Sequence, residues 1–189
     1  MIKIMLVKER NRREVEEKLK GLGNYVKIDY LLSCLKQPFI DFDTRRFVLL
    51  ELAKLYKEKK MFLEAGKMIQ SAAPINTTYK GMINDYVASA EMFVKAGNFD
   101  NADISFEKAI GCASDKERFD IKQIKIDCYK GQAEEFFRND KRNNAMIAFE
   151  KLLTLNLAGS ERREVQEKLL GLYDKLGRIR EYYSLKRGM

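Results

Sequence analysis

The chain has 189 residues, of which 34% are charged and 46% hydrophobic, and it carries a formal net charge of +8 with no histidine. This length is sufficient for one domain with a substantial core, or for a short array of repeated units. The absence of histidine removes the commonest general base near neutral pH, which disfavours most hydrolase and transferase mechanisms. No stretch approaches the roughly 20 uninterrupted apolar residues of a membrane-spanning helix. The composition therefore predicts a soluble, helix-rich protein that is not an enzyme.

The start of the chain and the cysteines indicate where the protein resides. The opening run MIKIMLVKER is too short in its apolar part for a signal peptide and has no small-residue cleavage site after it. Cys34, Cys112 and Cys128 are odd in number and lack CxxC spacing, so no zinc site is expected. We predict reduced, mostly buried cysteines, no metal, no cofactor and a cytoplasmic location.

The first predicted elements are two helices, over residues 7–21 and 25–36, which form an atypical hairpin within residues 1–45. Ile28, Leu32 and Leu35 recur at helical spacing in the second of them. Terminal units of repeat proteins commonly depart from the pattern of the internal ones.

The next feature is the acidic stretch Asp41-Phe42-Asp43-Thr44, which superficially resembles motifs that hold magnesium. The phosphatase form of such a motif needs threonine four residues after the first aspartate, where this chain has Arg45. We therefore predict that Asp43 or Thr44 caps a helix beginning near Arg45.

The central part of the chain shows a helical pattern interrupted by Gly97. Apolar and small residues recur at helical spacing on both sides of this glycine. The pattern reads Tyr86-x2-Ser89-Ala90-x2-Phe93, then Ala102-x3-Phe106-x2-Ala109. Because Gly97 can adopt the left-handed backbone that ends a helix, the stretch predicts two antiparallel helices joined by a tight turn.

The same pattern recurs before and after this stretch. Equivalent second-helix positions are Ala65, Ala102, Ala145 and, in a weaker copy, Tyr182, which lie 37, 43 and 37 residues apart. A period of this length indicates stacked helical hairpins. Residues 115–139, opened by the capping box Ser114-x-x-Glu117, predict one long first helix.

These residues resemble the tetratricopeptide repeat (TPR). That pattern pairs a large residue, a small one and an aromatic on the first helix with Ala-x3-Phe-x2-Ala on the second. Residues 83–116 match best, and about four copies cover residues 46–187. The period of this chain is longer than the roughly 34 residues usual for the family. In this respect it is similar to the period of soluble NSF attachment proteins. The resemblance implies an all-α, right-handed α-solenoid of about five antiparallel helical hairpins, forming a single domain over residues 1–189.

The periodic aromatic residues have two interpretations. Tyr56, Phe93, Phe136 and Tyr173 could form a stacking platform for a ligand, but they occupy the inward position between paired helices. We therefore predict that they belong to the core.

The resemblance also implies a concave groove lined by the outward face of each first helix. We expect a non-catalytic adaptor or scaffold that binds a peptide or helix of a protein partner there. The predicted partner-binding residues are Leu50, Lys54, Lys57, Val87, Glu91, Val94, Lys130, Glu134, Phe137 and Arg138. Three of them, Val87, Val94 and Phe137, would offer exposed apolar contacts. The alternative is that these three pack against neighbouring repeats.

One established mode of the family is not expected. Some members hold chaperone carboxyl tails with a lysine and asparagine clamp. Leu50 and Asp85 stand where that clamp would need a cation and an amide. A receptor for chaperone tails is therefore disfavoured.

The basic ends of the chain support an alternative function, binding to RNA or to an acidic surface. The residues concerned are Arg10, Arg12, Arg13, Arg178, Arg180, Lys186 and Arg187. Tyr182 and Tyr183 lie beside the second group, and a positive patch with aromatics is compatible with RNA. Acidic residues interleave with the first group, so pairing on a helix surface explains much of it. The oligomeric state is not determined by the sequence, although a dimer would cover apolar surface left by the incomplete fourth copy.

Overall fold

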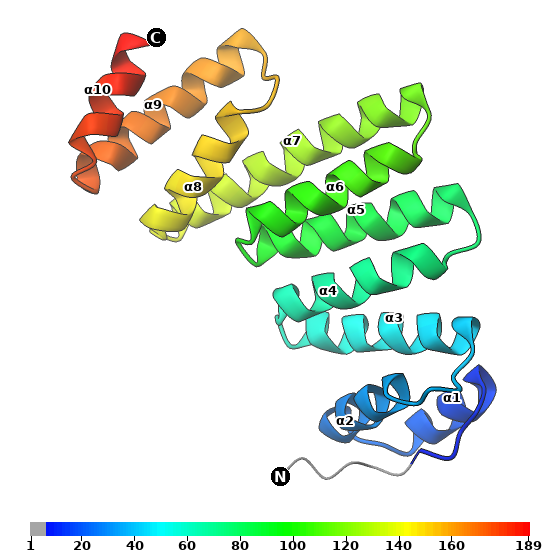
Figure 1. Cartoon of the computed structure of the whole chain (residues 1–189). Coiled ribbons are helices and arrows are strands. Elements are labelled where there is room, and N and C mark those ends of the chain that lie inside the picture. Colours follow the sequence, from blue (N-terminus) through cyan, green and yellow to red (C-terminus); the bar gives the residue numbers. More distant parts are fainter. Residues whose placement is uncertain (1–6) are drawn as a thin grey trace. The chain divides into compact units, whose positions relative to one another are not determined.

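The computed structural model describes residues 7–189, and within that range all regular structure is helical (Figure 1). The α-helices are α1 Arg12–Lys20, α2 Asn24–Leu35, α3 Phe42–Glu58, α4 Phe62–Ala72, α5 Tyr79–Lys95, α6 Phe99–Cys112, α7 Asp115–Arg138, α8 Arg142–Leu153, α9 Gly159–Lys175 and α10 Ile179–Arg187. A short 3-10 helix, Ala73–Ile75, follows α4. The predicted all-α class and the predicted helix number are confirmed for this part of the chain. Part of the run MIKIMLVKER, residues 1–6, lies outside the described residues.

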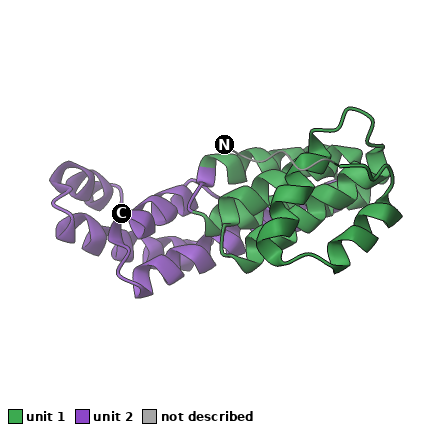
Figure 2. Cartoon of the chain, turned by 90° about the horizontal axis from the view of Figure 1, so that it is seen from below, with its two compact units in different colours: residues 1–96, 100–114 green, residues 97–99, 115–189 purple. Residues whose placement is uncertain are grey.

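The chain divides into two compact units (Figure 2). Unit 1 comprises residues 1–96 and 100–114, and unit 2 comprises residues 97–99 and 115–189. Unit 1 therefore holds α1 to α5 and nearly all of α6, whereas unit 2 holds α7 to α10. No helix in the described range combines the length and the apolar character needed to cross a bilayer. The single domain expected over residues 1–189 stays a prediction.

Consecutive helices pack in antiparallel pairs within each unit (Figure 1). In unit 1, α4 contacts both α3 and α5, and in unit 2, α8 contacts both α7 and α9. The helices α1 and α2 correspond in extent to the two helices expected over residues 7–21 and 25–36, and both pack against α3. The capping box prediction also gives the bounds of α7 to within one residue.

The predicted cap of α3 was wrong by two or three residues. The helix begins at Phe42 and its N-cap is Asp41, not Asp43 or Thr44. Thr44 instead donates twice to Asp41, from its amide to Oδ1 and from its hydroxyl to Oδ2, each at 2.8 Å. The amide bond, followed by the hydroxyl bond, lowers the pKa of Asp41. Asp41 prevails because its backbone is extended and it stands three residues before a free helical amide, which is the capping geometry.

The helices α3, α5, α7 and α9 end in the same backbone conformation. The second residue after each helix has a positive φ, and these residues are Lys60 (58°), Gly97 (73°), Asp140 (53°) and Gly177 (68°). The next amide then donates to the carbonyl of an aromatic residue near the helix end. The pairs are Met61 to Tyr56 at 2.9 Å, Lys141 to Phe136 at 2.9 Å and Arg178 to Tyr173 at 2.8 Å. This is a Schellman-type ending, in which an orphan carbonyl is satisfied as the chain reverses.

The aromatic residues predicted to belong to the core do so. Phe93 is 1% exposed, and Tyr56, Phe136 and Tyr173 are also buried. The second-helix alanines Ala65, Ala102 and Ala145 are completely buried, whereas Tyr182, from the weaker fourth copy, is only half-buried. The small residues thus lie where neighbouring helices pack, which close-packed interiors require.

Helices α4 and α5 are in close contact at Gly66. A Cβ atom added there would lie 2.9 Å from two ring carbons of Phe93. The hydroxyl of Ser89 donates to the carbonyl of Gly66 at 2.9 Å, so a buried polar bond crosses the same contact. The side chain of Gln70 donates to Ser105 Oγ at 2.8 Å, which connects α4 with α6. The absence of a side chain at Gly66 is therefore required by the packing.

Replacing Gly66 with alanine tests this contact. Alanine favours a helix over glycine by about 1 kcal/mol, but here the ring of Phe93 is buried and cannot move away. We expect Gly66→Ala to lower the free energy of unfolding by about 1–3 kcal/mol in urea denaturation. The control is Gly131→Ala in α7, where nothing lies within 4 Å of the added atom; it should leave stability equal or raise it. Equal effects of the two changes would contradict the contact.

The positive φ of Lys60 gives a second prediction. A side chain with a Cβ is disfavoured in the left-handed conformation, and glycine is not. We expect Lys60→Gly to raise the free energy of unfolding by about 0.5–1 kcal/mol. Lys54→Gly, inside α3, should instead lower it by about 1 kcal/mol. A loss of stability in both variants would show that the ending of α3 is not left-handed in solution.

Candidate partner-binding surface

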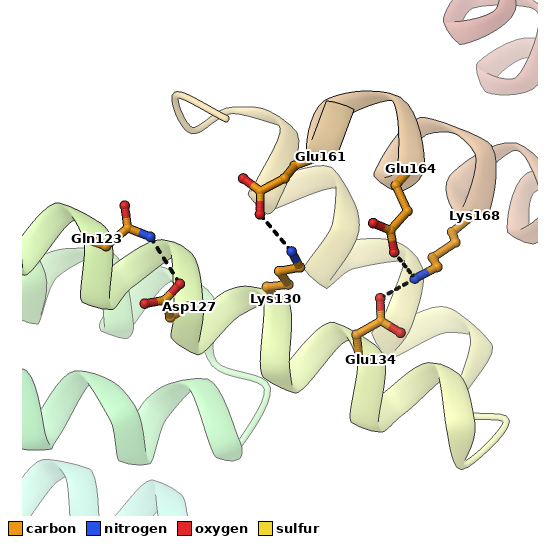
Figure 3. Close-up of polar contacts among 7 residues, drawn as sticks. All are labelled: Gln123, Asp127, Lys130, Glu134, Glu161, Glu164 and Lys168. Atoms are coloured by element: carbon orange, nitrogen blue, oxygen red, sulfur yellow. Dashed lines mark hydrogen bonds and ion pairs between the residues drawn. The ribbon is translucent and has the colours of Figure 1, made fainter. Parts of the chain in front are cut away.

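In unit 2, the first helices α7 and α9 are joined by a row of ion pairs (Figure 3). Lys130 Nζ lies 2.7 Å from Glu161 Oε1, and Lys168 Nζ lies 2.6 Å from Glu134 Oε1. Lys168 also contacts Glu164, one turn earlier on α9, at 2.7 Å. We call these five residues the ion-pair row. It lies on the first-helix face where partner binding was predicted.

The ion-pair row is only partly open to solvent. The side chain of Lys168 is 26% exposed and that of Glu134 is 30% exposed. Burial lowers the pKa of Lys168, but its hydrogen bonds to Glu134 and Glu164 outweigh burial, so the pKa is raised overall. The hydrogen bond to Glu161 likewise raises the pKa of Lys130, and the bond to Lys168 lowers the pKa of Glu164. These hydrogen bonds favour the charged forms of Lys130, Glu164 and Lys168. With two lysines and three glutamates in contact, the row largely compensates its own charge.

Two predicted partner-binding residues, Lys130 and Glu134, thus contact α9. The other two on α7, Phe137 and Arg138, lie at its C-terminal end. Phe137 is 38% exposed, and its ring packs edge-on against Phe149 with centroids 6.1 Å apart. Phe137 therefore combines the two alternatives considered for it: it packs inside unit 2, and part of its side chain is exposed to solvent. Arg138 is exposed.

In unit 1, a smaller polar cluster joins α3 to α5. Arg46 Nη2 donates to Asp85 Oδ2 at 2.7 Å, and Asn76 Nδ2 donates to the same oxygen at 3.0 Å. The side chain of Asp85 is 15% exposed. Asp85 therefore holds the two first helices together rather than facing a ligand.

The remaining predicted residues of unit 1 lie further along the same helices. On α3, Leu50 is half-buried, and Lys54 and Lys57 are exposed. On α5, Val87 and Glu91 are both half-buried. These five residues supply a mixture of apolar and charged side chains that solvent reaches.

The prediction that Val94 is exposed was wrong. Val94 is 2% exposed. It stands one helical turn after Ala90 and two turns after Tyr86, both of which are buried. Because residues four apart share a helix face, Val94 belongs to the packed stripe of α5, as the alternative interpretation had it.

The basic residues near the start of the chain lie in unit 1, and one of them, Arg12, forms contacts with side chains of the same unit. Arg12 Nε lies 2.7 Å from Glu16 Oε1, and the guanidinium of Arg12 also stands 4.9 Å from the centroid of Phe47. Arg10 and Arg13 are exposed. Helix-surface pairing, expected from the interleaved acidic residues, thus accounts for Arg12.

The basic residues after residue 177 lie in unit 2. Arg178 lies 3.4 Å from Glu181, and Lys186 stands 5.6 Å from the ring centroid of Tyr182. Arg187 Nε donates to the carbonyl of Tyr183 at 3.3 Å, and Arg180 is exposed.

The described residues offer little for redox or metal chemistry. Cys34, Cys112 and Cys128 are not joined in disulfides; the first is buried and the others are half-buried. Burial raises the pKa of Cys34 to about 11, so its thiol is protonated and unreactive at neutral pH. Within residues 7–189, no group of His, Cys, Asp or Glu side chains is arranged to hold a metal ion.

Four residues with structural roles on this surface were missed by sequence reasoning: Arg46, Glu161, Glu164 and Lys168. The last three follow one another at spacings of three and four residues, which places them on one face of α9. That spacing could have predicted a charged face on α9. It could not have predicted that this face would contact α7.

Comparison with known proteins gives no family. No family model matches the chain, and no curated protein matches it. Among solved structures, the chain is similar to BtubC (BKLC) from P. vanneervenii, with 15% sequence identity and a TM-score of 0.36. That similarity covers 92% of this chain and 72% of the other. It is too weak to carry an argument about fold or function.

The ion-pair row predicts coupling between α7 and α9. In a double-mutant cycle of Glu134→Gln and Lys168→Met, we expect a coupling free energy of about 0.5–1 kcal/mol in low salt. The exposed pair Arg178 and Glu181 is the matched control, and its cycle should give about 0–0.3 kcal/mol. Urea denaturation at neutral pH measures both cycles. Coupling no larger than that of the control would contradict the contact between α7 and α9.

Proposed function

We propose that the protein is a non-catalytic, TPR-like adaptor of the cytoplasm that binds a peptide or an amphipathic helix of a protein partner. In this proposal the hairpins stack as a right-handed solenoid and the first helices line its groove. The repeated helix endings at Lys60, Gly97, Asp140 and Gly177 support this arrangement, because they recur at the spacing of the sequence repeat. Neither a cofactor nor a catalytic residue has a part in it.

The observation that carries the proposal is a difference in ion pairing: first-helix charges are paired in unit 2, whereas, among the described residues, lysines on a first helix of unit 1 are not. In unit 2, Lys130 and Glu134 are held by α9. In unit 1, Lys54 and Lys57 are exposed and form no ion pair within residues 7–189. They lie beside the half-buried Leu50 on α3. A partner is therefore expected to gain more from contacts with unit 1, where ion pairs are still to be made.

Site-specific crosslinking tests this function. Benzoylphenylalanine would replace Lys54 on the proposed surface or, as the control, Lys67 on the exposed face of α4. Irradiation in extract of the source cell, with and without nuclease, should give a protein adduct from position 54 that survives nuclease and is absent from position 67. Adducts that vanish with nuclease would favour the RNA alternative, and equal adducts from both positions would contradict the surface.

The affinity of the identified partner provides the quantitative measurement. We expect the double variant Lys54→Glu/Lys57→Glu to bind about tenfold more weakly, equivalent to about 1.4 kcal/mol. Lys67→Glu should bind within about twofold of the unmodified protein, since a single distant charge contributes little. Isothermal titration calorimetry on the full chain would give both values.

A further inference from the structure

Two turns of unit 2, α7–α8 and α9–α10, can be followed in Figure 1. Both turns carry positive side chains. The α7–α8 turn contributes Arg138, Lys141 and Arg142, and the α9–α10 turn contributes Lys175, Arg178 and Arg180. All of these residues are exposed. We call this set the basic edge. Only Arg138, Arg178 and Arg180 belong to the surfaces considered from the sequence, and there they were assigned to two different sites.

The two turns lie close together. An open hollow of about 470 Å³ is lined by residues 140–144 of the α7–α8 turn and by Leu176 of the α9–α10 turn. The charge of Lys175 also reaches Asp140: the hydrogen bond from Arg142 is the main cause of the lowered pKa of Asp140, and Lys175 adds to it. Lys141 and Arg142 therefore line the hollow, and Lys175 of the other turn acts on Asp140 in the same lining.

Most of this positive charge is not compensated within the chain. Arg142 donates to Asp140 at 2.8 Å, and Arg178 pairs with Glu181. The other cations of the basic edge form no ion pair in the part of the chain that the structure describes; they are Arg138, Lys141, Lys175 and Arg180. The ion-pair row of the same unit, by contrast, compensates itself. Unit 2 thus attracts anions at its turns rather than on its first-helix face.

Apolar side chains in and after the α9–α10 turn distinguish between anionic partners. Leu176, which lines the hollow, is half-buried, and Ile179, three residues later at the start of α10, is 66% exposed. These aliphatic side chains suit an aliphatic side chain of a peptide and offer nothing to a phosphate backbone. The described residues that line the hollow include no aromatic ring, whereas single-stranded nucleic acid is usually held by stacking on aromatic rings as well as by cations.

We propose that the basic edge binds an acidic segment of a protein partner. Carboxylates of that segment pair with Arg138, Lys141, Lys175 and Arg180, and one of its aliphatic side chains packs on Leu176 and Ile179. The proposal rests on the adaptor function and adds a second contact point, in unit 2, with a defined chemistry. Arginine and lysine both bind carboxylates, and the arginine fork can do so through two hydrogen bonds.

The test uses the full chain and a fluorescent peptide of five Glu-Glu-Leu units as the probe. Two further probes replace leucine with serine or replace the peptide with oligouridine of equal length. Fluorescence anisotropy in low salt should show the Glu-Glu-Leu peptide binding most tightly. We expect the double variant Arg138→Gln/Lys175→Gln to bind the Glu-Glu-Leu peptide about tenfold more weakly than the unmodified protein does, equivalent to about 1.4 kcal/mol.

Two variants complete the design. Ile179→Ser should weaken binding of the Glu-Glu-Leu peptide about threefold and leave binding of the Glu-Glu-Ser peptide unchanged, since only the first peptide has an aliphatic contact to lose. The control Lys36→Gln/Lys80→Gln removes the same charge from exposed positions of unit 1 and should change binding less than about twofold.

The opposite results would overturn the inference. They are tighter binding of oligouridine than of the peptide, equal losses in the edge and control variants, or no binding of the Glu-Glu-Leu peptide. The crosslinking experiment at Lys54 tests unit 1, whereas the peptide-binding experiment tests unit 2. A missing adduct there would count against the proposed adaptor surface, and failed peptide binding would count against the basic edge, so the two failures are distinguishable.

Discussion

The helix pairs that follow α2 depend on a backbone hydrogen bond at the end of the first helix. At the ends of α3, α7 and α9 this bond runs from the amide of Met61, Lys141 or Arg178 to the carbonyl of a buried aromatic residue. The bond forms only when the preceding residue takes a positive φ, which reverses the chain. Because the aromatic side chain is fixed in the core, the direction of the following helix is fixed with it. The helix contacts in each unit follow from that constraint.

Charge then determines which surfaces are left for other molecules. Lysines on first helices occur in both units, but their surroundings differ. Lys130 and Lys168 are satisfied by glutamates across α7 and α9, so a partner would have to compete with existing ion pairs. Lys54 has no such neighbour among the described residues, and the cations of the basic edge outnumber the carboxylates near them. Both proposed surfaces therefore lie where the chain leaves its charge uncompensated.

Sequence reasoning succeeded where a local pattern is sufficient. The helix number, the buried ring of Phe93 and the left-handed turn at Gly97 all follow from spacing along a single helix or from one residue type. It was wrong where two local interpretations competed. Asp41, rather than Asp43, caps α3, since of these two aspartates only Asp41 stands three positions before the capped amide of Thr44. Val94 is buried because it shares a helix face with Ala90.

The sequence by itself determined the helical class and the identity of the core aromatics, because the 3.6-residue period depends only on neighbours along the chain. Only the tertiary structure decided that Gly66 must lack a side chain beside Phe93, or that Lys168 pairs with Glu134. It also decided that Lys60 and Asp140 take the conformation that Gly97 takes. The physical reason is that these features depend on distances between residues remote in sequence, or on a turn whose strain the packing of two helices compensates.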